Sequence, residues 1–190
     1  IALIHGGGVE VYTRMLIEYT YKKYNTVLIC ASRYDKKLLP ENSCTIYDVD
    51  VPREISAAKD LKAVLKIRKI IKKENPEVLY CHSSMAGAIG RIAAVGLGCK
   101  VIYNPHGWSF DMAVSSEKKM FYRFMEKVLA ITTDKIVTIS EYEKRIALKN
   151  RICNENKIEV ILNGIDLDKC KSVKVEKTEL GYKEKDFIIG

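Results

Sequence analysis

The sequence has few of the features that identify membrane, metal and redox proteins. Its six cysteines are scattered, and no two have the Cys-x-x-Cys spacing that metal sites and redox motifs use. No apolar run approaches the about 20 residues that a transmembrane helix needs. Glycines follow the opening run Ile1–Ile4 after one histidine, a pattern unlike that of a signal peptide. We therefore expect a protein of the reducing cytoplasm.

Two common nucleotide-binding motifs are also missing. Gly6-Gly7-Gly8-Val9-Glu10 follows a short apolar run and opens an expected helix. It has neither G-x-G-x-x-G spacing, nor an acidic residue placed for a ribose, nor the lysine of a P-loop. Backbone N–H groups at a helix N-terminus bind anions, and glycine lets a phosphate approach closely. The segment indicates either a tight structural turn or a phosphate site formed by Gly7 and Gly8.

The composition is that of an ordinary globular domain, with 47% hydrophobic and 29% charged residues. Much of the net charge of +8 lies in Lys59–Lys73, where lysines recur at helical spacing. The expected apolar side of this helix is formed by Leu61, Val64, Leu65, Ile67, Ile70 and Ile71. Such a helix either packs on a core with a solvated lysine face or lies against anionic lipid headgroups. No nucleic-acid motif accompanies it, so no nucleic acid is expected as a partner.

Strand-like runs alternate with helical segments through most of the chain. The expected strands are Ile1–His5, Thr26–Ala31, Cys44–Val49, Val78–Cys81, Lys100–Tyr103, Lys135–Ile139 and Ile158–Leu162. The expected helices are Val9–Lys23, a basic helix ending at Glu74, Met85–Gly96, Glu117–Thr132 and a helix capped by Ser140 that runs to Lys149. This alternation predicts an α/β fold, a Rossmann-like and mostly parallel sheet with helices on both faces.

The pattern changes near the carboxyl end. Residues 1–170 form the expected Rossmann-like domain, and the charged segment 171–186 is interpreted as a linker or peripheral element. A new apolar run begins at 187–190, which we interpret as the start of a further, truncated domain.

All three histidines, His5, His82 and His106, follow or end expected strands. In open α/β sheets, ligands bind beyond the carboxyl ends of the strands, and histidine titrates near neutral pH. His106 also stands beside Gly107 and the only tryptophan, Trp108. The alternative is that these histidines cap helices or bond carbonyl groups. Their spacing has no metal-ligand pattern, so no metal site is expected.

Several short motifs occur in an order that points to a known family. They are Gly7-Gly8-Val9-Glu10, His82-Ser83, Asn104-Pro105-His106-Gly107-Trp108, Val137-Thr138-Ile139-Ser140 and Asn163-Gly164-Ile165-Asp166. In this order they resemble the amino-terminal, acceptor-side domain of family-four retaining glycosyltransferases, and especially the bacterial capsule and exopolysaccharide members. The resemblance covers nearly the whole chain.

The resemblance implies one half of a two-domain GT-B enzyme that transfers a hexosyl group from a nucleotide sugar to a saccharide or lipid-linked acceptor. It implies no metal or other cofactor. His106 would be the catalytic-site residue near the transferred sugar, and Gly7 and Gly8 would lie near the donor diphosphate. The other residues implied are Glu10, His82, Gly107, Trp108 and Ser140 as acceptor or sugar contacts, and Asn163, Gly164 and Asp166 at the interdomain crossing.

Two other classes share this architecture: sugar-nucleotide epimerases with two Rossmann-like domains, and non-catalytic α/β ligand-binding domains. Receiver-type binding domains need clustered aspartates at the strand ends, where this chain has histidines. The donor-binding domain, with its glutamate pair, is not in the sequence, so we do not expect the fragment to turn over by itself. The expected location is cytoplasmic and peripheral, at the inner face of a membrane that Lys59–Lys73 would contact.

Overall fold

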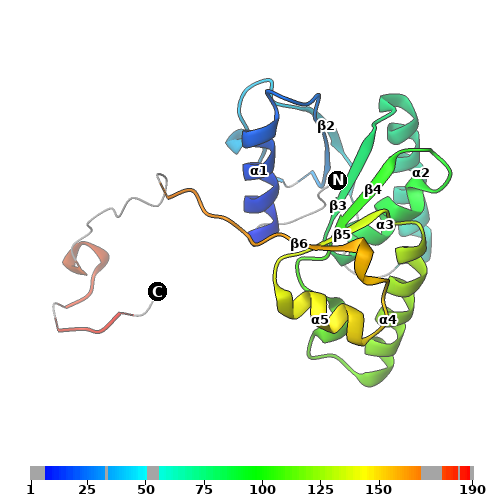
Figure 1. The fold of residues 1–190 in the computed structure, drawn as a ribbon. Coiled ribbons are helices and arrows are strands. Elements are labelled where there is room, and N and C mark those ends of the chain that lie inside the picture. The colour runs from blue at the N-terminus through cyan, green and yellow to red at the C-terminus, as the bar shows by residue number, and fades with distance from the viewer. Residues whose placement is uncertain (1–6, 33, 51–55, 168–176, 184, 189–190) are drawn as a thin grey trace.

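The structure is a computed structural model that describes residues 7–32, 34–50, 56–167, 177–183 and 185–188. Its described strands form two parallel sheets (Figure 1). In the smaller sheet β1 (Val27–Cys30) pairs with β2 (Thr45–Asp48). In the larger sheet the strands follow chain order: β3 (Val78–His82), β4 (Lys100–Asn104), β5 (Lys135–Thr138) and β6 (Ile158–Val160).

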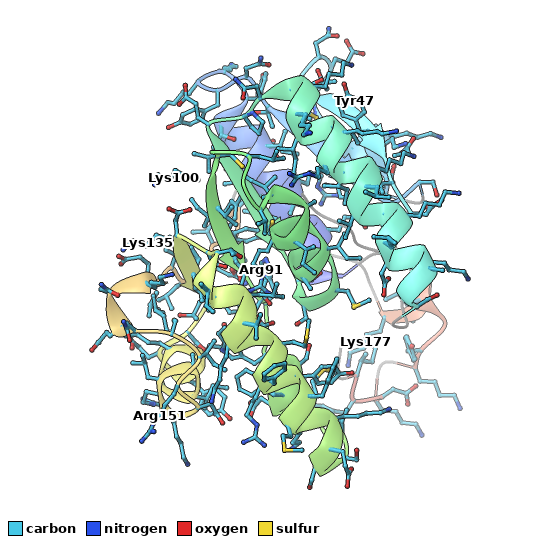
Figure 2. The ribbon with its side chains drawn as sticks, turned by 90° about the vertical axis from the view of Figure 1, so that its right-hand side faces the viewer. Tyr47, Arg91, Lys100, Lys135, Arg151 and Lys177 are labelled. Atoms are coloured by element: carbon cyan, nitrogen blue, oxygen red, sulfur yellow. The ribbon has the colours of Figure 1, made fainter. Side chains whose placement is uncertain are left out.

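Helix α1 (Gly8–Thr20) precedes β1. The helices that connect successive strands from β2 to β6 are α2 (Ala57–Glu74), α3 (Ser84–Ala94), α4 (Ser116–Ile131) and α5 (Glu141–Lys149). Helices α2, α3 and α4 lie side by side on one side of the larger sheet, with α1 on the other side (Figures 1 and 2). Strands that add in one direction through right-handed crossovers place their connecting helices on the same face.

Local sequence signals account for the helix ends. Ser115 and Ser140 cap α4 and α5, because their side chains accept hydrogen bonds from the backbone N–H groups of Lys118 and Glu143. Helix α2 ends at Asn75, which has a left-handed φ of 43° and precedes a proline. The interpretation of Ser140 as a helix cap is confirmed.

An ion pair lies inside the core. The guanidinium of Arg91 donates to Glu126 at 2.9 Å, and both side chains are buried. Tyr103 donates to the other carboxylate oxygen of Glu126 at 2.8 Å, and its ring lies 3.7 Å from the Arg91 guanidinium carbon. Gly87 allows this packing, because a Cβ there would collide with the Tyr103 ring. The network joins α3, β4 and α4.

The structure confirms the parallel α/β architecture and corrects several details. The described strands form two sheets, and the expected strand Ile1–His5 lies outside the described residues. Leu61 and Leu65 of α2 are exposed, whereas the sequence pattern placed them on the packed side. The core-facing line of α2 is narrower than expected and runs through Ala63, Ile67, Ile70 and Ile71.

Within the part of the chain that is described, no helix combines the length and the apolar character needed to cross a bilayer.

Removing one partner of the buried ion pair should lower the free energy of unfolding much more than removing one partner of an exposed pair. Replacing Glu126 by alanine leaves the Arg91 charge buried and uncompensated, so the free energy of unfolding should fall by about 3–5 kcal/mol. The exposed pair of Lys100 and Asp134 provides the control, because Lys100→Gln should cost less than about 1 kcal/mol. Urea unfolding of the full-length protein measures both. Similar losses in the two variants would contradict the assignment of the buried network as structural.

Candidate functional site at the carboxyl edge of the larger sheet

The carboxyl ends of β3 and β4 bring two histidines together. Parallel pairing sets His82 opposite Asn104, two residues before His106. His82 Nδ1 lies 3.1 Å from His106 Nε2, a hydrogen-bonding distance between two imidazole nitrogens. His82 is buried and His106 is half-buried, so the pair has an inner and an outer member. The prediction that these two residues share one edge is confirmed by their contact.

Two tyrosines complete an aromatic cluster around the histidines. Tyr12 of α1 meets the His106 ring edge-on, with ring centroids 4.9 Å apart, and Tyr80 of β3 lies against His82 at 4.2 Å. The two phenol oxygens are 3.3 Å apart. Because Tyr12 is in the second turn of α1, the first turn of that helix lies beside the histidine pair.

The backbone at this edge has positive φ angles, which residues with a side chain rarely adopt. Ser83 and His106 have φ of 63° and 51°, in the left-handed region, and Gly107 has φ of 103°. Glycine adopts such angles readily, whereas a residue with a side chain pays about 1–3 kcal/mol and keeps them where the surroundings enforce the conformation. Here the Asn104 side chain does so, because its Oδ1 accepts the His106 backbone N–H at 3.0 Å. Asn104 is fully buried.

Both imidazoles are neutral at physiological pH. Burial lowers the pKa of His106 to about 4. Burial also lowers the pKa of His82 well below its ordinary value of 6.5, and the neighbouring His106 adds to this effect. A neutral imidazole carries one N–H donor and one acceptor nitrogen. The pair is therefore suited to hydrogen-bond a hydroxyl group rather than to attract an anion.

Trp108 lies in the core and not at a ligand-facing surface. Its side chain is 2% exposed, it stacks on Phe110, and its indole N–H donates to the Glu143 carbonyl at 3.0 Å. The expected sugar contact is therefore not supported by its position. Its indole instead anchors the loop that carries His106 to the start of α5.

Glu143 is the partner that holds this loop. Its carboxylate accepts the backbone N–H groups of Ile139, at 3.1 Å, and of Gly107. Burial raises the pKa of this carboxyl, while the two backbone hydrogen bonds oppose that rise. Ser140, expected to contact substrate, uses its hydroxyl to accept the Glu143 N–H at 3.2 Å. Glu143 thus ties the loop after β4 to the turn after β5.

The remaining predicted residues lie at the start of α1 and on the segment after β6. Gly7, with φ of 86°, and Gly8 open α1, and within the described part of the chain no side chain caps the first turn. Glu10 is buried and accepts the Asp35 N–H at 3.4 Å, so its carboxylate is directed toward the loop after β1. Asn163, Gly164 and Asp166 lie on the segment after β6, where Asp166 accepts the Tyr19 hydroxyl of α1 at 3.1 Å. His5 lies outside the described residues.

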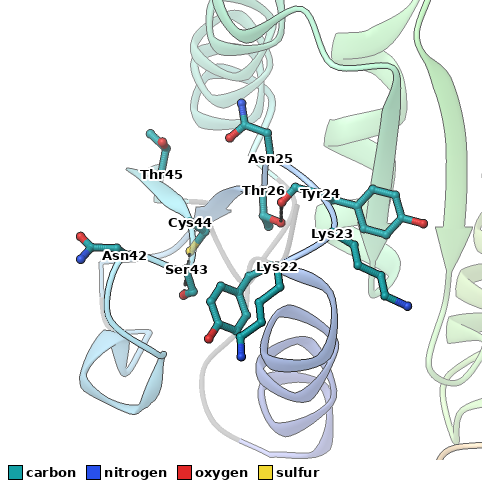
Figure 3. Close-up of a pocket in the computed structure, with 10 residues that line it drawn as sticks. Lys22, Lys23, Tyr24, Asn25, Thr26, Asn42, Ser43, Cys44 and Thr45 are labelled. Carbon is teal, nitrogen blue, oxygen red and sulfur yellow. Dashed lines mark hydrogen bonds between the residues drawn. The ribbon is translucent and has the colours of Figure 1, made fainter.

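A separate hollow of about 510 Å³ lies away from the histidines (Figure 3). It is lined by residues 21–26, after α1, and residues 42–45, before and at the start of β2. These residues lie at the amino ends of β1 and β2. Ligands of parallel α/β folds bind at the opposite edge. We therefore place the candidate site at the histidine pair.

The sequence reasoning missed Tyr12, Tyr80, Asn104 and Glu143 as parts of the site. Asn104 could have been found, because asparagine side chains in turns often hydrogen-bond the backbone two residues further on, which here is His106. Glu143 could also have been found, since Ser140 and Glu143 have capping-box spacing. Tyr12 and Tyr80 have no such signal, because their meeting depends on how α1 packs against the sheet.

A parallel Rossmann-like sheet with polar residues at the carboxyl ends of its strands defines a ligand-binding α/β domain. The sequence matches Glycosyltransferase Family 4 over residues 6–169, and the chain belongs to this family.

Two curated relatives and one solved structure illustrate the match. The chain is 32% identical over 142 residues to the Escherichia coli UDP-Gal:alpha-D-GlcNAc-diphosphoundecaprenol alpha-1,3-galactosyltransferase, covering 72% of this chain and 36% of the relative. It is 29% identical over 181 residues to the Staphylococcus aureus capsular polysaccharide biosynthesis glycosyltransferase CapM, covering 92% and 47%. Anabaena HepE, solved in complex with UDP and glucose, superimposes with a TM-score of 0.68 at 15% identity, covering 94% of this chain and 48% of HepE. The chain thus spans less than half the length of these proteins.

The neutral histidine pair predicts a loss of stability in mild acid. In the unfolded chain both imidazoles titrate near pH 6.5, whereas in the folded protein the pKa of His106 is about 4. Between these values the unfolded state binds more protons, so the free energy of unfolding falls as the pH decreases from about 6.5 toward 4. Urea unfolding of the full-length protein at several pH values measures this dependence. His106→Gln should make it shallower, and an unchanged dependence would contradict the lowered pKa.

Proposed function

We propose that the chain is the acceptor-side domain of a retaining glycosyltransferase. The full enzyme would transfer a hexosyl group from a nucleotide sugar to a saccharide or lipid-linked saccharide during synthesis of a capsule, exopolysaccharide or other cell-surface glycan. The observation that carries the proposal is the neutral His82–His106 pair at the strand carboxyl edge, in a chain of Glycosyltransferase Family 4. Family membership favours transfer over the epimerase alternative.

The geometry supports a division of roles. His106, the outer histidine, would hydrogen-bond a hydroxyl of the transferred sugar, while buried His82 holds its ring from behind. The uncapped first turn of α1, at Gly7 and Gly8, would stabilise the negative charge that develops on the departing diphosphate. Tyr12 connects the two parts, because it belongs to α1 and contacts His106. The segment 163–166 would lead to the donor-binding domain.

The names of the relatives support the substrate class. One relative uses a UDP-sugar and a diphosphoundecaprenol-linked acceptor, and the HepE structure contains UDP and glucose. We therefore propose a panel of UDP-hexoses and a polyprenyl-diphosphate-linked saccharide as first substrates. Retention requires the product to keep the anomeric configuration of the donor, which NMR of the purified product shows. Release of an epimerised sugar nucleotide without acceptor would instead establish the alternative class.

Substitution of His106 tests the site within that enzyme. His106→Asn removes the imidazole while keeping a residue that tolerates the left-handed backbone, so stability should change little. Turnover should fall about 100-fold, as when one preorganised hydrogen-bond donor is lost. Steady-state kinetics and thermal unfolding of the full-length enzyme measure both quantities. Lys100→Gln, at the amino end of β4, is the control. Normal turnover of a folded His106→Asn variant would refute the assignment.

A peripheral membrane contact is part of the proposal. Lys62, Lys69 and Lys72 of α2 are exposed, and the proposed acceptor is anchored to a lipid. Each lysine near an anionic surface contributes about 1 kcal/mol. Changing these three residues to glutamine should weaken sedimentation with phosphatidylglycerol vesicles at least about tenfold.

The control makes the same change in net charge elsewhere, with Lys22, Lys23 and Lys37 replaced by glutamine. These lysines are exposed in the part of the chain that contains α1 and β1. Equal binding of the two triple variants, or equal affinity of the unmodified protein for neutral and anionic vesicles, would remove α2 from the proposal.

A further inference from the structure

Helix α4 has apolar side chains on its solvent-facing side as well as on its core-facing side. Leu129 and Ala130 face the core, as does Glu126 in its buried ion pair. The opposite side of the helix is apolar as well, with Phe124 62% exposed and Ile131 77% exposed. The outward stripe consists of Met120, Phe121, Phe124, Val128 and Ile131, all of them exposed. At 100° per residue these side chains occupy one continuous face that points away from the sheet.

The charges beside the stripe are mainly basic. Lys118 and Lys127 border the stripe and are exposed, and among the described residues neither forms an ion pair. Glu117 is the only exposed acidic residue of α4. It lies on the stripe's own face, one turn before Phe121, and in the first turn of the helix, where the helix dipole favours a negative charge. Lysine is depleted in the centres of protein–protein interfaces, whereas apolar residues bordered by lysines are typical of helices that lie in a membrane surface.

The stripe is on the same side of the molecule as the basic residues of α2. Figure 2 looks onto α2, α3 and α4, with α1 behind them. On α2, Leu61 and Leu65 are exposed among lysines, so this layer offers positive charge together with apolar side chains. Gly107 and Trp108 separate His106 from Ser109, where the 3-10 turn Ser109–Asp111 begins the connection to α4. A single connection therefore joins the site to α4.

We propose that the outward face of α4 inserts into the surface of an anionic bilayer, with Phe121 and Phe124 as its main apolar anchors. In this proposal the lysines of α2 attract the anionic headgroups, and the apolar side chains of α4 are buried in the bilayer surface. This inference rests on the proposed lipid-linked acceptor for its purpose, but its test does not depend on glycosyl transfer. Bilayer insertion would hold the His82–His106 pair near the membrane surface where such an acceptor lies.

Vesicle binding by the full-length protein tests the inference. Phe121→Ser together with Phe124→Ser should lower the partition coefficient for phosphatidylglycerol-containing vesicles at least about tenfold, because each phenylalanine loses its apolar burial. The control, Tyr24→Ser with Leu38→Ser, removes two exposed apolar side chains near β1 and β2 and should bind normally. Transfer to a soluble acceptor should be unchanged, so a failed membrane test leaves the proposed activity standing.

Fluorescence locates the inserted residue. Trp108 is buried, so brominated lipids should not quench it, and Phe124→Trp should add a signal that they do quench. Unchanged vesicle binding of the double serine variant would overturn the inference. So would a loss of thermal stability in that variant without vesicles, which would show that another part of the chain covers α4. Dissociation of a dimer by the same variant would show that a second copy covers it.

Discussion

The structure depends on the parallel register between β3 and β4. That register sets His82 opposite Asn104, and everything at the candidate site follows from this pairing. The buried amide of Asn104 bends the next residues back, so that the imidazole of His106 turns toward that of His82 rather than toward solvent. Slipping one of the two strands by one residue would turn its side chains to the opposite face of the sheet and separate the two histidines. The site is therefore a property of the sheet more than of any loop.

Two buried carboxylates support this edge from different sides. Glu126 neutralises Arg91 and receives the Tyr103 hydroxyl, which fixes α3 and α4 against β4. Glu143 receives backbone N–H groups from two separate turns, and its own carbonyl receives the Trp108 indole. Glu126 thus holds α3 and α4 against β4, and Glu143 holds the loop that carries His106. This loop needs such external support because His106 has a left-handed backbone, a conformation that residues with a side chain rarely adopt.

Much of this arrangement could be predicted from the sequence, and the limits have physical causes. Strand and helix positions follow from hydrophobic periodicity and capping residues, so β3 to β6 and α2 to α5 agree with expectation to within a few residues. His82 and His106 could be predicted as neighbours because parallel strands end at one edge. The burial of Trp108 could not, because a tryptophan beside a glycine is equally compatible with a ligand-facing loop and with a core anchor. The exposure of Leu61 and Leu65 was not predicted either. Periodicity shows that a helix has an apolar side, but it does not show that every residue of that side faces the core.

The contact between the two imidazoles has a consequence for how a ligand would be recognised. Each neutral ring carries a single proton, so the nitrogens 3.1 Å apart must be one donor and one acceptor. If His82 donates from Nδ1, then Nε2 of His106 accepts and Nδ1 of His106 carries a proton. If His106 donates from Nε2, its Nδ1 becomes an acceptor and His82 takes the other tautomer. A hydroxyl that binds at His106 Nδ1 would thereby select the tautomer of a ring that it never touches.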